Sequence, residues 1–222
     1  MDVDITKMQR EEKTVFRNVK TTSDETTGVY DVVKRGLDVT AALLGMILLS
    51  PLYVFFFVWI KLEDGGPVIF SQERIGYKGQ KFLLYKFRSM IPEAEKEGVP
   101  QLCERDDARL TKIGRFLREH HLDELPQLWN VLKGEMSFVG PRPERAYFVE
   151  QIMAINPDYR LLFHLRPGLF SMATLYNGYT DTMQKMLIRL RMDLDYLEHR
   201  NLWLDVKIIL LTMCYLLGGK KF

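Results

Sequence analysis

One uncharged run, from Val39 to Ile60, restricts what this chain can fold into more than any other feature. It reads VTAALLGMILLSPLYVFFFVWI, 22 residues without an acidic or basic side chain. As a helix it would be about 33 Å long, enough to cross a hydrocarbon core of about 30 Å. A signal peptide is a poor interpretation, because the run starts late and no small-residue cleavage site follows it. The run therefore predicts insertion into a membrane, in preference to burial in a soluble core.

Ser50 and Pro51 stand in the middle of this run and predict that the helix is bent. Proline donates no backbone hydrogen bond, and its ring clashes with the carbonyl four residues earlier, that of Ile47. The Ser50 hydroxyl can donate to a carbonyl of the preceding turn, which spares an unpaired acceptor in lipid. The two arms, Val39–Leu49 and Leu52–Ile60, would be about 16 and 14 Å long, each about half of a bilayer core.

The charges that flank the run favour neither orientation. Counted within about 20 residues of each end, three basic residues precede it and three follow it. They are Lys20, Lys34 and Arg35, then Lys61, Arg74 and Lys78. A tie is expected if both flanks stay on the cytosolic side, so we expect residues 31–61 to form a re-entrant membrane helix. An ordinary kinked span stays open as the alternative.

The remaining residues predict a polar arm and one catalytic domain of α+β class, predominantly helical. Residues 1–30 are polar with weak periodicity and predict a loosely ordered arm. Residues 62–222 predict the membrane-associated domain, with a short β-hairpin around the Gly76–Gly79 turn and a charged loop over 92–107. Helical spacing predicts amphipathic helices over Ala108–Glu119, Met183–Glu198 and Asn201–Leu217. For the first and the last of these helices, contact with the membrane interface stays open.

Composition excludes several classes of function. A net charge of +2 gives no overall argument for nucleic-acid binding. Cys103 and Cys214 form no CxxC pair, so neither a disulfide scaffold nor a thiolate zinc site is expected. The four histidines show no metal-ligand spacing.

Residues that could carry chemistry gather between 120 and 145. Asp123 and Glu124 are expected to open a helix, where they would either cap free amides or take part in a reaction. Arg142 stands between two prolines in a rigid turn that suits bidentate phosphate binding, and Lys86 and Arg88 add cations at the end of the hairpin. Two carboxylates beside several cations suit a metal-assisted reaction at a diphosphate, and oxygen ligands without His or Cys indicate Mg²⁺.

Six motifs stand in order between residues 34 and 144. They are Lys34-Arg35-x-x-Asp38, Ser50-Pro51, Gly66-Pro67-Val68-Ile69-Phe70-x-Gln72-x-Arg74-x-Gly76, Lys86-Phe87-Arg88-Ser89-Met90, the segment LDELPQLWNVLKG over 122–134, and Gly140-Pro141-Arg142-Pro143-Glu144. Together they resemble the bacterial sugar transferase family, the monotopic phosphoglycosyl transferases, in its minimal form. The resemblance thins after Gly168, where the chain departs from the usual Thr-Gly-x-Ala-Gln pattern of the family.

The resemblance implies transfer of a sugar-1-phosphate from a UDP-sugar to polyprenyl (undecaprenyl) phosphate. The reaction would take place among the lipids of the bacterial inner membrane, on its cytosolic face. Such a step would begin the synthesis of a glycoconjugate, and a homo-oligomer stays open. It also implies that Asp123 is a nucleophile that carries the phosphosugar covalently, that Glu124 holds Mg²⁺, and that Arg142 binds phosphate. Lys86 and Arg88 are expected as further phosphate contacts.

Two alternatives stay open. One is a membrane-anchored enzyme of phosphate chemistry that uses the same cations without a covalent step. The other is a membrane-anchored interaction protein without catalysis, in which Asp123 and Glu124 only cap a helix.

Overall fold

The computed structural model describes residues 24–91, 107–177 and 182–217, and within them it is predominantly helical with two small sheets. The expected α+β class is therefore confirmed. The loop expected over 92–107, apart from its last residue, lies outside the described residues, as does the arm up to residue 23. The elements in chain order are α2 (Asp24–Leu48), α3 (Ser50–Asp64), β1 (Ile69–Ile75), η2 (Tyr77–Gly79), β2 (Lys81–Phe87), α4 (Lys112–Glu119), η3 (Leu122–Glu124), α5 (Gln127–Lys133), β3 (Ser137–Val139), α6 (Ala146–Ile155), η4 (Pro157–His164), β4 (Gly168–Phe170), α7 (Met172–Asn177), α8 (Met183–His199) and α9 (Leu202–Leu217).

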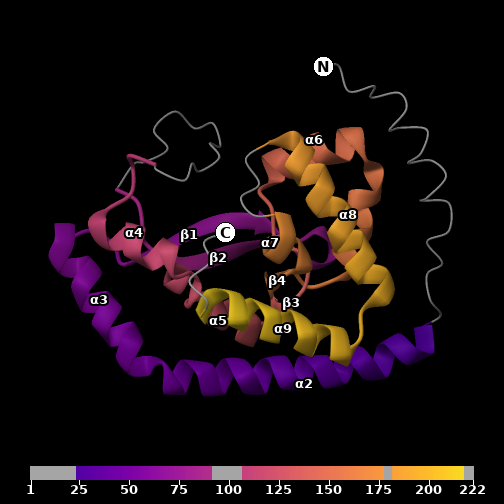
Figure 1. The fold of residues 1–222 in the computed structure, drawn as a ribbon, viewed down its shortest axis with the longest axis horizontal. Helices are drawn as coiled ribbons and strands as arrows, with labels where there is room; N and C mark the ends of the chain where they lie inside the picture. The colour runs from indigo at the N-terminus through magenta and orange to yellow at the C-terminus, as the bar shows by residue number, and fades with distance from the viewer. Residues whose placement is uncertain (1–23, 92–106, 178–181, 218–222) are drawn as a thin grey trace.

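The uncharged run forms the end of α2 and most of α3, which meet at a bend of 60° (Figure 1). The Ser50 hydroxyl donates a hydrogen bond of 2.8 Å to the carbonyl of Ile47, the acceptor that Pro51 leaves free. The predicted bend and its local donor are thus confirmed. Among the described residues, no single helix has the length and apolar composition to cross a membrane, whereas the bent pair together does. The re-entrant path stays a prediction.

The bent pair begins earlier than expected, because α2 starts at Asp24 instead of residue 31. Contacts with the C-terminal helices hold these first turns. The Tyr30 hydroxyl donates to Asp205 of α9 at 2.8 Å, and Arg200 pairs with Asp31 at 2.7 Å. The sequence pattern does not predict these contacts, because the partners lie more than 160 residues away along the chain.

Side chains of the Lys34-Arg35-x-x-Asp38 motif attach α2 to the rest of the protein. Lys34 pairs with Asp205 at 2.7 Å, and Arg35 donates to two backbone carbonyls at the end of α5, at 2.7 and 3.0 Å. Asp38 accepts a hydrogen bond of 3.1 Å from the backbone N–H of Phe138 in β3. In Figure 1, α2 accordingly runs along one edge of the molecule, next to α5 and α9.

One face of α3 packs on the domain and the other is exposed. Phe56 and Ile60 are buried against Phe87, Ile113 and Leu117, from β2 and α4. Other apolar side chains of the pair are largely exposed, and so many exposed apolar side chains on one helix pair indicate a partner or a membrane. They are Leu43, Leu44, Ile47, Leu48, Val54, Phe55, Phe57, Val58, Trp59 and Leu62.

The two sheets place the functional segments next to one another. β1 and β2 form the expected antiparallel hairpin, with Ile69 opposite Phe87. β3 and β4, which the sequence did not predict, pair in parallel. The chain approaches itself so closely here that a Cβ on Gly168 would lie 2.1 Å from the backbone nitrogen of Gly140. This contact explains glycine at both positions and fixes the start of the turn that carries Arg142.

Two of the three predicted amphipathic helices have nearly the bounds seen in the structure, and the third was predicted too long. α8 and α9 cover Met183–His199 and Leu202–Leu217, close to the expected ranges. α4 begins at Lys112, because the Thr111 side chain caps it by accepting from the Gly114 N–H at 2.9 Å. Arg109 therefore lies outside the helix, where it pairs with Asp107.

Candidate active site

Asp123 and Glu124 lie in η3, one turn of 3-10 helix that precedes α5. The expectation that they open the helix is wrong, since α5 begins only at Gln127. Pro126 explains the difference: it has no N–H to donate to a carbonyl of the preceding turn, so the regular helix starts after it. The pair is therefore not placed to cap the free amides of α5, which was the simplest alternative to a chemical role.

Two cations from other elements converge on one carboxylate oxygen of this pair. Lys86 Nζ, at the end of β2, lies 2.7 Å from Glu124 Oε1. Arg142 Nη2, in the turn after β3, lies 2.9 Å from the same oxygen. Lys86 Nζ is also 3.6 Å from Asp123 Oδ2. The structure thus brings together four of the predicted site residues, from three separate segments of the chain.

The two carboxylates have different electrostatic surroundings. Burial raises the pKa of Asp123, an effect that the charge of Lys86 opposes and that of Glu124 reinforces. Burial also acts to raise the pKa of Glu124, but the charges of Arg142 and Lys86 outweigh it and hold that pKa far below its usual range. Paired carboxyl groups whose pKa values are pushed apart are suited to different roles in one reaction. The lowered pKa favours the ionised form of Glu124, whereas Asp123 is the less engaged of the two.

Contacts that the sequence did not reveal hold these side chains in place. The Tyr53 hydroxyl, on α3, donates a hydrogen bond of 2.5 Å to the carbonyl of Leu125, directly after the pair. Arg74 Nη1 lies 3.2 Å from the carbonyl of Pro143 and 3.3 Å from Glu144, so β1 supports the turn that carries Arg142. Arg189 of α8 pairs with the other oxygen of Glu144 at 2.7 Å.

Arg88 has a different environment from the other predicted phosphate contacts. It is buried, pairs with Asp64 at the end of α3, and packs so closely on Gly66 that a Cβ there would meet its guanidinium at 1.9 Å. Among the described residues, its Nε and Nη1 find no hydrogen-bond partner. Its contact with substrate phosphate stays a prediction, and the observed role of Arg88 is to hold the turn after α3.

The donor set of the site fits a magnesium ion that the substrate helps to bind. In the part of the chain that the structure describes, no three side chains of His, Cys, Asp or Glu come together as ligands. Asp123 and Glu124 supply adjacent hard oxygen atoms. Mg²⁺ is commonly held by one or two carboxylates together with substrate phosphates and water, so a full protein cage is not required.

The fold and the site define a class of protein: a small domain on a bent apolar helix pair, with a carboxylate pair and converging cations. The chain belongs to the bacterial sugar transferase family, whose sequence profile matches residues 29–219. The resemblance stated from its motifs is thereby confirmed.

The curated relatives that the chain matches align with most of its length. A UDP-N-acetylgalactosamine-undecaprenyl-phosphate N-acetylgalactosaminephosphotransferase of Aeromonas hydrophila is 41% identical over 86% of the chain and 45% of its own length. A UDP-glucose:undecaprenyl-phosphate glucose-1-phosphate transferase of Escherichia coli is 40% identical, over 84% and 40%. One of the same name from Caulobacter vibrioides is 42% identical, over 84% and 70%. The chain thus spans less than half of the first two relatives.

Proposed function

We propose that this protein transfers a sugar-1-phosphate from a UDP-sugar to a polyprenyl phosphate at a membrane surface. The observation that carries the proposal is the convergence of Lys86 and Arg142 on the Asp123-Glu124 pair, in a chain of this family. The names of the relatives support it, since each acts on undecaprenyl phosphate. Those names include both glucose and N-acetylgalactosamine, so the family alone does not specify the sugar.

Asp123 acts in this proposal as the nucleophile. Its carboxylate oxygen attacks the sugar-proximal phosphorus of the diphosphate, the bond from that phosphorus to the bridging oxygen breaks, and UMP leaves with the bridging oxygen. A phosphate oxygen of the polyprenyl acceptor then attacks the same phosphorus and releases the Asp123 carboxylate. Covalent catalysis divides one transfer between a soluble donor and a lipid-bound acceptor into two easier steps.

The neighbouring charges make the attack possible. A diphosphate repels a carboxylate, so cations must neutralise it before the two approach. Lys86 and Arg142 lie within reach of the pair and supply two such charges. Glu124 would hold Mg²⁺, which supplies Lewis-acid neutralisation of the diphosphate when bound.

The proposal places the catalytic domain on the cytosolic face of the bacterial inner membrane, with α2 and α3 entering and leaving the same leaflet. The exposed apolar side chains on both arms of the bent pair support insertion. The bend of 60° at Leu49 supports a path that returns to the side from which it entered. Both flanks of the pair would then lie where UDP-sugars are found.

A UMP-release assay tests the function. The full chain in detergent or nanodiscs is incubated with Mg²⁺, undecaprenyl phosphate and a panel of UDP-sugars. We expect one or a few donors to give equal amounts of UMP and polyprenyl-diphosphate sugar. Release of UMP with free sugar phosphate would indicate a hydrolase, and no release with any donor would favour the interaction protein. Either result would contradict the proposal.

A further inference from the structure

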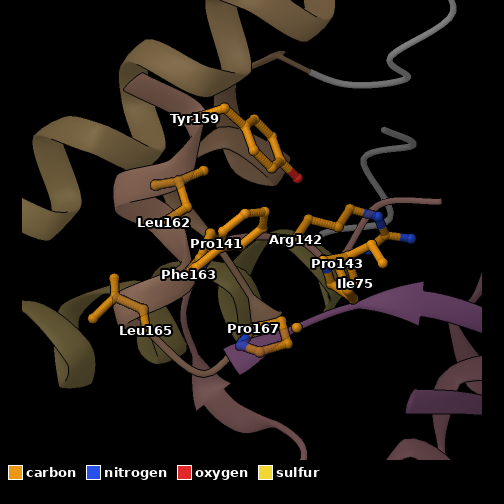
Figure 2. Close-up of a pocket in the computed structure, with 10 residues that line it drawn as sticks. Ile75, Pro141, Arg142, Pro143, Tyr159, Leu162, Phe163, Leu165 and Pro167 are labelled. Carbon is orange, nitrogen blue, oxygen red and sulfur yellow. The ribbon is translucent and has the colours of Figure 1, made fainter. Parts of the chain in front are cut away.

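A pocket adjoins the proposed active site and shares Arg142 with it. It is an open hollow between the end of β1, the Pro141–Pro143 turn and η4, as Figure 2 shows, with about 250 Å³ of space when the adjoining solvent is included. Its walls are mainly apolar, formed by three prolines, Phe163 and aliphatic side chains. Arg142 and Tyr159 are the lining residues with polar side chains.

Both polar groups are able to bind a ligand. Within the described residues, the structure shows no hydrogen bond from the Tyr159 hydroxyl, which in Figure 2 points away from the apolar wall and towards the side of Arg142. Burial raises the pKa of this phenol, so it stays protonated and can donate. Arg142 contacts Glu124 through Nη2, yet 35% of its side chain is exposed. Arg142 thus lines the edge of the pocket, while its guanidinium extends away from the apolar wall in Figure 2 and contacts Glu124.

The chemistry of the walls restricts the occupant. The sugar of the donor carries many hydroxyl groups, which require more polar partners than one phenol and one guanidinium. A polyprenyl chain would be expected near the apolar helices, but none of the lining residues comes from α2, α3 or α4. A flat ring with carbonyl acceptors fits proline and phenylalanine walls and a single hydroxyl donor.

We propose that this pocket holds the uracil ring of the donor nucleotide, with the Tyr159 hydroxyl donating to a ring carbonyl and Arg142 binding the adjoining phosphate. The inference rests on the proposed function, because it takes a UDP-sugar as the donor. It adds a base-recognition site built from η4 and the Pro141–Pro143 turn. The pocket would select the donor by its pyrimidine, and UMP would bind it as a leaving group.

Photo-crosslinking tests where the base lies without requiring turnover. The full chain is loaded with 5-iodo-UMP, irradiated and digested, and the adduct is located by mass spectrometry. We expect the adduct within residues 157–167, and unlabelled UMP should suppress it more effectively than AMP. An adduct confined to another segment would overturn the proposal.

A matched pair of variants tests the hydroxyl. Tyr159→Phe keeps the ring and removes the donor, and Tyr147→Phe is the control, on the exposed side of α6. Loss of one hydrogen bond should weaken UMP binding by about 3- to 10-fold in Tyr159→Phe, with no change in the control. Binding of ribose 5-phosphate, which lacks the base, should be the same in all three proteins. Equal UMP affinity in Tyr159→Phe and wild type, or an equal loss for ribose 5-phosphate, would contradict the assignment.

These measurements separate the pocket from the proposed function. A 5-iodo-UMP adduct at 157–167 in a protein that transfers no sugar phosphate would support the pocket and refute the function. Transfer activity with the adduct elsewhere would support the function and refute the pocket.

Discussion

Tyr53 offers a direct test of whether the bent helix pair positions the catalytic residues. Its hydroxyl crosses from α3 to the carbonyl of Leu125, one residue beyond Glu124, at 2.5 Å. Tyr53→Phe removes this hydrogen bond but keeps the ring, whose centroid lies 5.5 Å from that of Phe87. The packing of α3 on the hairpin should therefore be retained, and the variant isolates the hydroxyl.

The expected loss of stability is small. A buried hydrogen bond contributes about 0.5–1.5 kcal/mol, and more is lost when its partner is left unpaired. The carbonyl of Leu125 also accepts from the Leu128 N–H at 3.0 Å, so it keeps one partner. We therefore expect a loss of about 1 kcal/mol, which lowers Tm by about 2–4 °C in a chain of this size.

The expected loss of activity is larger, because the hydroxyl fixes the turn that carries both carboxylates. A misplacement of about 1 Å can reduce a rate by about 100-fold. We expect kcat to fall by about 10-fold or more while KM for the UDP-sugar changes little, since Tyr53 is not expected to touch the donor. Thermal unfolding and steady-state kinetics in nanodiscs measure the two effects, with Tyr147→Phe as the exposed control. Wild-type kcat in Tyr53→Phe would refute the link between α3 and the site.

Three further predictions concern the carboxylate pair, the phosphate contact and the membrane path. Glu124→Gln should raise the Mg²⁺ concentration needed for half-maximal rate and lower the rate; an unchanged metal titration would contradict its role as ligand. Arg142→Lys should lower kcat/KM by at least about 10-fold, because a point charge cannot replace a planar fork, and near-normal kinetics would remove Arg142 from the site. Replacing Ser50-Pro51 by Ala-Ala should straighten the pair and move a cysteine introduced at Lys20 to the outer face, where a membrane-impermeant thiol reagent labels it in intact cells. Labelling of that cysteine in the otherwise wild-type chain would refute the re-entrant path.

Local chemistry explains the features that could be predicted from the sequence. Proline at position 51 requires a bend, and the serine before it supplies a donor for the freed carbonyl; both occur as expected. The hairpin follows from two apolar runs around a glycine turn. Asp123 and Glu124 were identified as the centre of the site because two acidic residues stand beside motifs rich in arginine and proline.

Long-range contacts account for what the sequence could not show. The hydrogen bond of Tyr53 joins residues 72 apart, and no periodicity marks it. β3 and β4 have three residues each, too few for an alternating pattern, and pair only because Gly140 and Gly168 allow the backbones to touch. Arg88 resembles Lys86 in sequence, two positions along the same segment, yet it is buried beside Asp64 while Lys86 reaches Glu124. Pro126 delayed the start of α5, although proline is also common in first turns.

Trapping of the phosphosugar on the protein tests the central claim most directly. The full chain is mixed with Mg²⁺ and a UDP-sugar labelled in the sugar, without polyprenyl phosphate, then quenched and digested. The account predicts label on the peptide that contains Asp123, lost when undecaprenyl phosphate is added before the quench and absent in Asp123→Asn. Asp195→Asn, at an exposed carboxylate of α8, is the matched control and should label like the wild type. Full turnover in Asp123→Asn, or label on another residue, would contradict the account.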